Sequence, residues 1–324
     1  MTADIEHVFV DAGEIRMHAA VAGPEDGPAV LLCHGFPESW YSWRHQLRAL
    51  GDAGYRVIAP DQRGYGQTDA PEDVSAYSQI HLVGDLVGLL TALDVESATV
   101  VGHDWGGPVA WHAALLRPDL FPAVVGISVP FSPRLPGGVR PTESLRAALG
   151  TSFLYVLYFQ EVGVAEAELD ADIRGTLRRI LYSISGDIPR ADFRFFDPNA
   201  TCFNDLMREP DRLPDWLTEE DLDVFVREFE RKGTFRHGLN WYRNIDQTWQ
   251  LLAPFVNSKV TQPALFIGAE YDAIFGMTPE SVKATKAWVP HLREPIWVPD
   301  CGHWVQQEEP AVVNKALLDF LATI

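Results

Sequence analysis

A glycine-rich turn directly after an apolar stretch is the feature that most constrains this chain. Residues 98–101 are mostly apolar and typical of a buried strand, and Gly-His-Asp-Trp-Gly-Gly follows at 102–107, before a helical pattern. This order of strand, small-residue turn and helix is typical of a nucleophile elbow, where larger residues at the glycine positions would collide with nearby backbone. The elbow presents its central side chain, which here is Asp104.

A carboxylate at this position restricts the chemistry. An aspartate with the ordinary pKa of about 3.9 is ionised at neutral pH and needs no base before it attacks. Attack on an ester or amide would give only an anhydride, whereas attack on a carbon electrophile gives an ester, so epoxides or alkyl halides are favoured as substrates. A phosphate-binding loop is the alternative, but the glycine spacing differs from G-x-G-x-x-G and Asp104 would repel phosphate.

Composition excludes several partners and locations. The net charge of −19 argues against nucleic acid or an anionic membrane as a partner, because no cluster of basic residues could neutralise phosphates. The three cysteines lie far apart, so we expect no disulfide framework and a reducing compartment. The N-terminal residues lack the pattern of a secretory signal, and no apolar run is long enough for a membrane span. We therefore expect a cytoplasmic enzyme.

Strand signals occur in two blocks around a helical stretch. They lie at 7–10, 15–21, 29–33, 56–59, 98–101 and 124–129, and again at 264–268 and 295–298. The first two suit an antiparallel hairpin, and the later apolar runs suit a buried parallel sheet. A helix is expected at 77–93, and Thr218 with the acids after it is typical of a helix N-cap.

The prediction is an α/β protein of the α/β-hydrolase type. It has a mostly parallel eight-stranded sheet flanked by helices, with a core formed by residues 1–141 and 253–324. Residues 142–252 form an inserted all-helical lid, because this stretch carries aromatic residues in a helical pattern and no buried-strand run.

The order of polar residues after the strands is that of an α/β-hydrolase triad. Asp104 comes first, an acid follows a late strand, and His303 follows the last strand. His303 is expected to be the general base, and Asp272 to orient its imidazole. Glu270 and Asp300 are rivals for the role of the acid, but Asp272 follows its strand by a loop of more suitable length.

Hydrolysis of an ester on Asp104 produces an oxyanion that needs hydrogen-bond donors. The backbone N–H groups of Phe36 and Trp105 are the expected pair, and their side chains are expected to line an apolar substrate pocket. His34 is as readily explained by a structural hydrogen bond as by catalysis, so it is left out of the triad.

Five stretches resemble soluble epoxide hydrolases, especially the hydrolase domain of the mammalian enzyme. They are HGFP (34–37), GHDWGG (102–107), YVLYFQ (155–160), NWYRN (240–244) and CGHW (301–304). The similarity spans essentially the whole chain. The elbow and the HGFP loop are shared with dehalogenases, whereas the two tyrosine motifs of the lid are more specific.

The resemblance implies a set of roles and a reaction. Asp104, Asp272 and His303 would form the triad, and Tyr155 and Tyr242 would hold the epoxide oxygen. The substrates would be a lipophilic epoxide and water, the product a vicinal diol, and no cofactor or metal would be needed.

The chemistry independently favours tyrosines in the lid. Opening an epoxide leaves an alkoxide far more basic than a phenolate, so a neutral phenol with a pKa of about 10 can donate to it. Tyr155 and Tyr158 are three residues apart on one helical face, so the spacing alone leaves the choice between them open. The resemblance selects Tyr155. Val156 departs from the mammalian pattern, which has glutamine there, so amide ligands are expected to sit differently.

A haloalkane dehalogenase is the alternative function. It would use the same aspartate but would stabilise a departing halide with side-chain N–H donors, and Phe36 has none to complement Trp105. A fluoroacetate-type dehalogenase would be expected to carry arginine where this chain has Trp105. A ligand receptor on this fold would be favoured if the nucleophile or the base were lost, and both are present.

Overall fold

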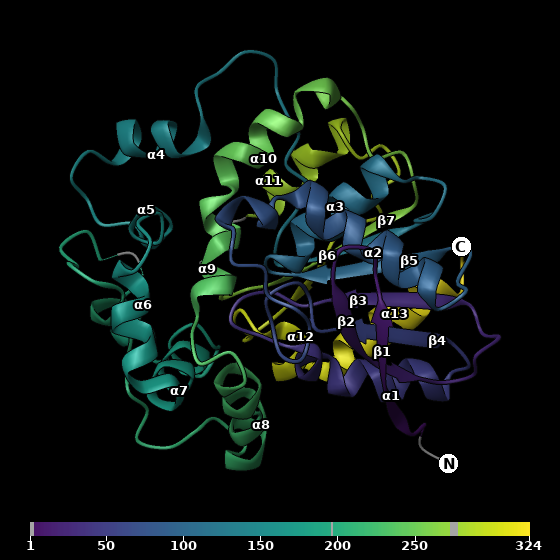
Figure 1. Ribbon diagram of the computed structural model, residues 1–324, viewed down its shortest axis with the longest axis horizontal. Helices are drawn as coiled ribbons and strands as arrows, with labels where there is room; N and C mark the ends of the chain where they lie inside the picture. Colours follow the sequence, from purple (N-terminus) through teal and green to yellow (C-terminus); the bar gives the residue numbers. More distant parts are fainter. Residues whose placement is uncertain (1–2, 196, 273–277) are drawn as a thin grey trace.

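Eight strands form one sheet in the computed structural model, which describes residues 3–195, 197–272 and 278–324. The strands are β1 (Ile5–Asp11), β2 (Arg16–Ala22), β3 (Ala29–Cys33), β4 (Arg56–Pro60), β5 (Ala98–His103), β6 (Val124–Ile127), β7 (Ala264–Ala269) and β8 (Ile296–Val298). Their order is β1-β2-β4-β3-β5-β6-β7-β8 (Figure 1). Strand β2 pairs antiparallel with β1 and β4, and the other pairs are parallel, which confirms the predicted sheet.

Both faces of the sheet are covered by helices. In β3, Val30 and Leu32 belong to a core shared with α1 (Arg44–Asp52) and α13 (Pro310–Leu321). The alternate residues of β3, Leu31 and Cys33, belong to a second core shared with α2 (Gln79–Ala92) and α3 (Gly106–Leu116). Since successive side chains of a strand point to opposite faces, burial on both sides explains why this strand is wholly apolar.

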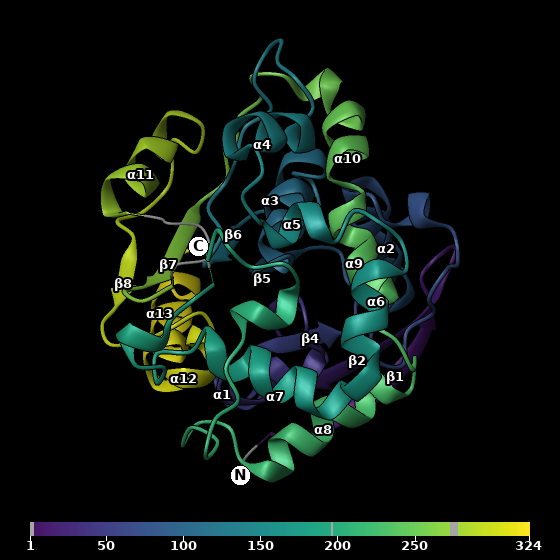
Figure 2. The same cartoon turned by 90° about the vertical axis from the view of Figure 1, so that its left-hand side faces the viewer.

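The sequence between β6 and β7 carries helices that we call the lid, using the predicted range 142–252. Its α-helices are α4 (Pro141–Leu149), α5 (Tyr155–Tyr158), α6 (Val164–Leu169), α7 (Ile173–Ser183), α8 (Glu219–Glu230), α9 (Arg236–Arg243) and α10 (Ile245–Leu251). Helices α4 to α8 lie to the left of the sheet in Figure 1 and in front of it in Figure 2. The lid faces the loops after β5 and β6, because residues from both sides line one cavity.

Two further α-helices follow the lid, α11 (Pro279–Ala284) and α12 (Val305–Glu308). Within the three described ranges, no helix combines the length and the apolar character that crossing a bilayer requires.

Helix ends follow local side-chain chemistry. The predicted cap at Thr218 forms a capping box, in which Asp221 N donates to Thr218 Oγ1 at 3.1 Å and Thr218 N donates to Asp221 Oδ2 at 3.0 Å. The predicted helix at 77–93 begins two residues too early. Ser78 is extended, with φ −70° and ψ 158°, and separates a 3-10 turn at Val74–Tyr77 from α2.

Two glycines of α2 provide a matched test of helix packing. A Cβ atom on Gly84 would meet nothing within 4 Å, whereas one on Gly88 would collide with the backbone of Ala12 in the turn between β1 and β2. We expect Gly84→Ala to stabilise the protein by up to about 1 kcal/mol, the helix-propensity difference between the two residues. We expect Gly88→Ala to destabilise it by about 1–3 kcal/mol through overpacking. Chemical denaturation measures both changes, and equal effects would contradict this packing.

Candidate active site

The elbow places Asp104 at the end of β5 with strained backbone. Its φ is +49°, which is uncommon for a residue other than glycine, and its side chain is buried. A Cβ atom on Gly102 would collide with the carbonyl of Gly106, and one on Gly106 would collide with the carbonyl of Cys33. These close approaches explain why the predicted turn needs glycine at both positions.

His303 lies between two carboxylates. Its Nδ1 is 3.0 Å from Asp272 Oδ2, and its Nε2 is 3.6 Å from Asp104 Oδ2. A carboxylate can only accept, so Nδ1 of His303 carries a proton and donates it to Asp272. This bond orients the ring so that Nε2 faces Asp104. The three predicted triad residues are therefore brought together.

The two rival acids lie elsewhere. Glu270 and Asp300 are exposed, and Glu270 Oε2 accepts from Asp300 N at 3.2 Å. The Tyr271 hydroxyl donates to Asp300 Oδ1 at 3.0 Å. Of the three candidate acids, Asp272 is the one that contacts the imidazole of His303.

The charges around His303 control its protonation. Burial alone would lower the pKa of His303, but the carboxylates of Asp272 and Asp104 outweigh burial and raise this pKa to about 10. The imidazole is therefore protonated at neutral pH while both carboxylates are charged. Removal of either negative charge would lower its pKa and favour the neutral ring, which can accept a proton from water.

The loop after β3 supplies a donor to the nucleophile. The backbone N–H of Phe36 donates to Asp104 Oδ1 at 2.8 Å. This approach requires Gly35, because a Cβ atom there would collide with the Asp104 carboxylate. Trp105 follows Asp104 in the chain and its side chain lines the adjacent cavity. The role of its backbone N–H as a second donor stays a prediction.

His34 holds this loop in place. Its Nδ1 donates to the carbonyl oxygen of Gly35 at 2.9 Å, and its Nε2 accepts from the backbone N–H of Gln62 at 3.0 Å. Both ring nitrogens are thus engaged by backbone groups, which supports the structural interpretation of His34.

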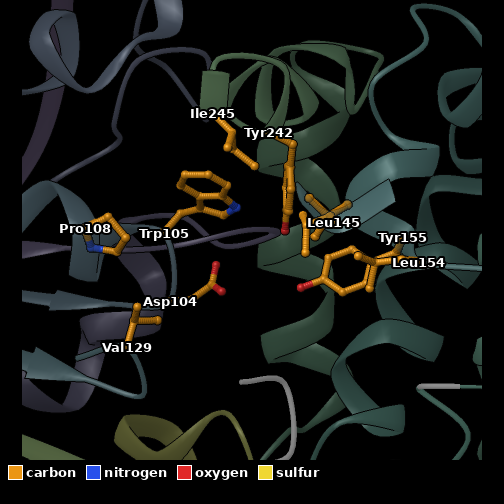
Figure 3. Close-up of a pocket in the computed structure, with 10 residues that line it drawn as sticks. Asp104, Trp105, Pro108, Val129, Leu145, Leu154, Tyr155, Tyr242 and Ile245 are labelled. Carbon is orange, nitrogen blue, oxygen red and sulfur yellow. The ribbon is translucent and has the colours of Figure 1, made fainter. Parts of the chain in front are cut away.

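Two lid tyrosines face Asp104. Figure 3 shows the hydroxyl groups of Tyr155, from α5, and Tyr242, from α9, pointing into the space beside the carboxylate. Burial, together with the charge of Asp104, raises the pKa of both phenols, so both stay protonated and can donate hydrogen bonds. Tyr158 is directed elsewhere, since its hydroxyl donates to Glu168 Oε2 at 2.8 Å.

An apolar cavity of about 380 Å³ opens beside these groups (Figure 3). It is lined by Asp104, Trp105, Pro108, Val129, Leu145, Leu154, Tyr155, Val156, Tyr242 and Ile245. A volume of this size with a few polar groups is typical of a small-molecule site. No cluster of His, Cys, Asp and Glu side chains suited to a metal ion occurs in the described part of the chain.

A buried polar network that was not predicted from the sequence lies beneath the triad. Glu38 Oε2 accepts from His103 Nδ1 and Gly35 N, each at 2.8 Å, and its Oε1 accepts from Gln306 Nε2 at 2.9 Å. His103 Nε2 lies 2.8 Å from the carbonyl oxygen of His303. Burial would raise the pKa of Glu38, but His103 and the Gly35 N–H outweigh burial and lower it to about 2. The position of Glu38 directly after the HGFP stretch was the available signal.

Glu308 was missed as well. Its carboxylate accepts from the backbone N–H groups on both sides of His303, Gly302 at 2.8 Å and Trp304 at 2.9 Å. It also accepts from Gly186 N of the lid at 2.8 Å. Burial raises the pKa of Glu308. The signal in the sequence was an acid five residues after His303, although Glu309 directly beside it made the choice between the two ambiguous.

Comparisons with known proteins agree with this geometry. The family model for the alpha/beta hydrolase fold matches residues 28–166. Epoxide hydrolase A of Mycobacterium tuberculosis is 45% identical over 315 residues, which cover 97% of this chain and 96% of that protein. Bifunctional epoxide hydrolase 2 of Sus scrofa is 39% identical over 322 residues, which cover 98% of this chain and 55% of that protein.

Solved structures give the same result. The crystal structure of epoxide hydrolase A from Mycobacterium thermoresistibile superposes with a TM-score of 0.91 at 48% identity, covering 98% of both chains. An epoxide hydrolase from an endophytic Streptomyces superposes with a TM-score of 0.91 at 44% identity, covering 99% of this chain and 96% of that one. The predicted fold and resemblance are confirmed, and the chain belongs to the epoxide hydrolases of the α/β-hydrolase fold.

Proposed function

We propose that this epoxide hydrolase converts a lipophilic epoxide to a vicinal diol through a covalent ester on Asp104. The observation that carries the proposal is the position of the Asp104 carboxylate. It lies between the hydrogen-bonded pair of His303 and Asp272 on one side and two neutral phenols on the other. These phenols, Tyr155 and Tyr242, face it across an apolar cavity. In this arrangement the phenols serve the opening of the epoxide, and His303 with Asp272 serves the hydrolysis of the ester.

The first half-reaction opens the epoxide. Asp104 Oδ1 is held by the N–H of Phe36, so Oδ2 is the oxygen that attacks a ring carbon. The carbon–oxygen bond of the ring breaks, and the leaving oxygen receives hydrogen bonds from Tyr155 and Tyr242, one of which supplies its proton. Both phenols are protonated when the reaction starts, since burial keeps the pKa of each raised.

The second half-reaction hydrolyses the ester. Esterification removes the negative charge of Asp104, so the pKa of His303 falls and its imidazolium loses a proton, which restores the phenol that protonated the epoxide oxygen. The neutral Nε2 can then accept a proton from water. The resulting hydroxide attacks the ester carbonyl carbon, and negative charge develops on Oδ1. The N–H of Phe36 already contacts Oδ1, and the N–H of Trp105 is the proposed second donor. Collapse of this intermediate breaks the bond between the carboxyl carbon and Oδ2, and the leaving oxygen takes the proton of the His303 imidazolium to complete the diol. The new carboxyl group of Asp104 returns a proton to His303, which restores the carboxylate and the imidazolium of the free enzyme.

A haloalkane dehalogenase is not favoured. Halide departure would need side-chain N–H donors, and Phe36 has no such group at the position opposite Trp105. The paired phenols instead suit an oxygen leaving group. The four relatives described above are all named epoxide hydrolases.

A single turnover in heavy-oxygen water tests the covalent route. With enzyme in excess, we expect unlabelled diol and label in the peptide that contains Asp104, because water enters at the ester carbonyl. Labelled diol should emerge only in later turnovers. Mass spectrometry of peptide and product measures both. Direct attack of water on the epoxide would instead label the diol in the first turnover and leave the peptide unlabelled.

Removal of either phenol should slow ring opening. We expect Tyr155→Phe and Tyr242→Phe each to lower the single-turnover alkylation rate by about 10- to 1000-fold, the range for a positioned proton donor. The double variant should be nearly inactive. Tyr158→Phe is the matched control, since Tyr158 contacts Glu168. Wild-type alkylation rates in both single variants would refute the assigned role.

The rate of ester hydrolysis should depend on pH through a His303 whose pKa is lower in the ester than in the free enzyme. We expect the rate to rise with pH around an inflection about one to three pH units below 10, the pKa of His303 when Asp104 is charged. The reason is that the neutral ester no longer stabilises the imidazolium, and only neutral imidazole is a base. Rapid quenching of preformed ester across neutral and alkaline pH measures the inflection. A value at or above 10 would contradict this coupling.

A further inference from the structure

Among the described residues, two spaces of very different size border Asp104. The cavity of about 380 Å³ lies on one side, and a second space of about 20 Å³ lies on another. Asp104, Tyr155 and Tyr242 line both. A water molecule needs about 10–15 Å³, so the smaller space has room for about one water or a methyl group. We call the two spaces the large lobe and the small lobe.

Packed aromatic rings form the wall of the small lobe. Phe159 and Phe203 are 5.0 Å apart between ring centroids, and Phe195 is 5.0 Å from the ring of Tyr155. Ile180 from α7 completes this wall. All four of these lid residues are less than 5% exposed, so none can move toward solvent without uncovering apolar surface. A second bulky group placed here would have to displace rings that are already in contact.

Aliphatic side chains line the lid side of the large lobe. They are Leu145 from α4, Leu154 and Val156 at α5, and Ile245 from α10. Apart from the indole N–H of Trp105, the polar side-chain groups of the large lobe are those proposed to react, so a substituent lying there is held mainly by apolar contact. An alkyl or aryl group fits this chemistry.

Because Asp104, Tyr155 and Tyr242 line both lobes, an epoxide with its oxygen on the two phenols would have one ring carbon toward each lobe. We propose that the substrates of this enzyme are one-sided epoxides, with the apolar alkyl or aryl group on one ring carbon and nothing larger than methyl on the other. This inference rests on the proposed function, because it takes Asp104 as the reacting group. It goes further in assigning the substitution pattern that the site accepts.

Three epoxides test the inference on the wild-type enzyme. Styrene oxide carries phenyl on one ring carbon, its trans methyl derivative adds a methyl on the other, and trans-stilbene oxide adds a second phenyl there. We expect kcat/KM for trans-stilbene oxide to be at least about 100-fold below that for styrene oxide, because overpacking penalises the second phenyl. The methyl derivative should fall between them. Comparable values for styrene oxide and trans-stilbene oxide, within about tenfold, would overturn the inference.

Variants test whether the small lobe causes the preference for styrene oxide over trans-stilbene oxide. Ile180→Ala and Phe203→Ala should each raise the ratio of kcat/KM for trans-stilbene oxide to that for styrene oxide by about tenfold or more, because each removes volume from the small lobe. Leu145→Ala is the matched control, since it enlarges the large lobe. The ratio is measured on one preparation, so a reduced folded fraction cancels, and Ile180→Val is a milder replacement.

The outcomes separate the two proposals. A rise in the ratio for Leu145→Ala alone, or for none of the three variants, would overturn the small lobe as the determinant of specificity and leave epoxide hydrolysis intact. Failure of the wild-type enzyme to form diol from all three epoxides would overturn the proposed function, and the inference with it.

Discussion

The buried carboxylate of Glu38 is the constraint on which the site depends. A buried charge without partners costs several kcal/mol, so the surrounding loops must keep their N–H donors within reach of it. Gly35 N comes from the loop after β3, His103 from the elbow strand, and Gln306 from α12. Since His103 also contacts the carbonyl of His303, the spacing of nucleophile, oxyanion donor and base is fixed by one polar network.

The charges of the site control the order of the two half-reactions. Two carboxylates, Asp104 and Asp272, raise the pKa of His303 in the free enzyme, so the base is unavailable before an ester exists. Nucleophilic attack by Asp104 needs no base, and it removes one of the charges that keep the imidazole protonated. In the proposed mechanism the first half-reaction thereby generates the catalyst of the second, while the buried phenols stay neutral beside the same carboxylate.

The fold and the nucleophile could be predicted because their signals are local. The elbow around Asp104 depends on a few adjacent residues, and strands buried on both faces are continuous apolar runs. Loop length favoured Asp272 as the acid beside His303, but Glu270 and Asp300 stayed rivals because the contact with the imidazole is tertiary and has no local signal. Spacing alone also left Tyr155 and Tyr158 equivalent. The role of Glu308 could not be predicted from the sequence, since one of its hydrogen-bond partners, Gly186, is 122 residues away in the chain.

The lid does more than cover the cavity, because it also holds the base. The backbone N–H of His303 donates to the carbonyl of Ile184 at 2.9 Å, and the indole of Trp304 donates to the carbonyl of Leu181 at 2.8 Å. Lid and base loop therefore form one mechanical unit. A chimera that exchanged lids between relatives to alter specificity would need to preserve the path of the chain through Leu181 and Ile184. Otherwise the exchange would misplace His303 while leaving every catalytic residue present.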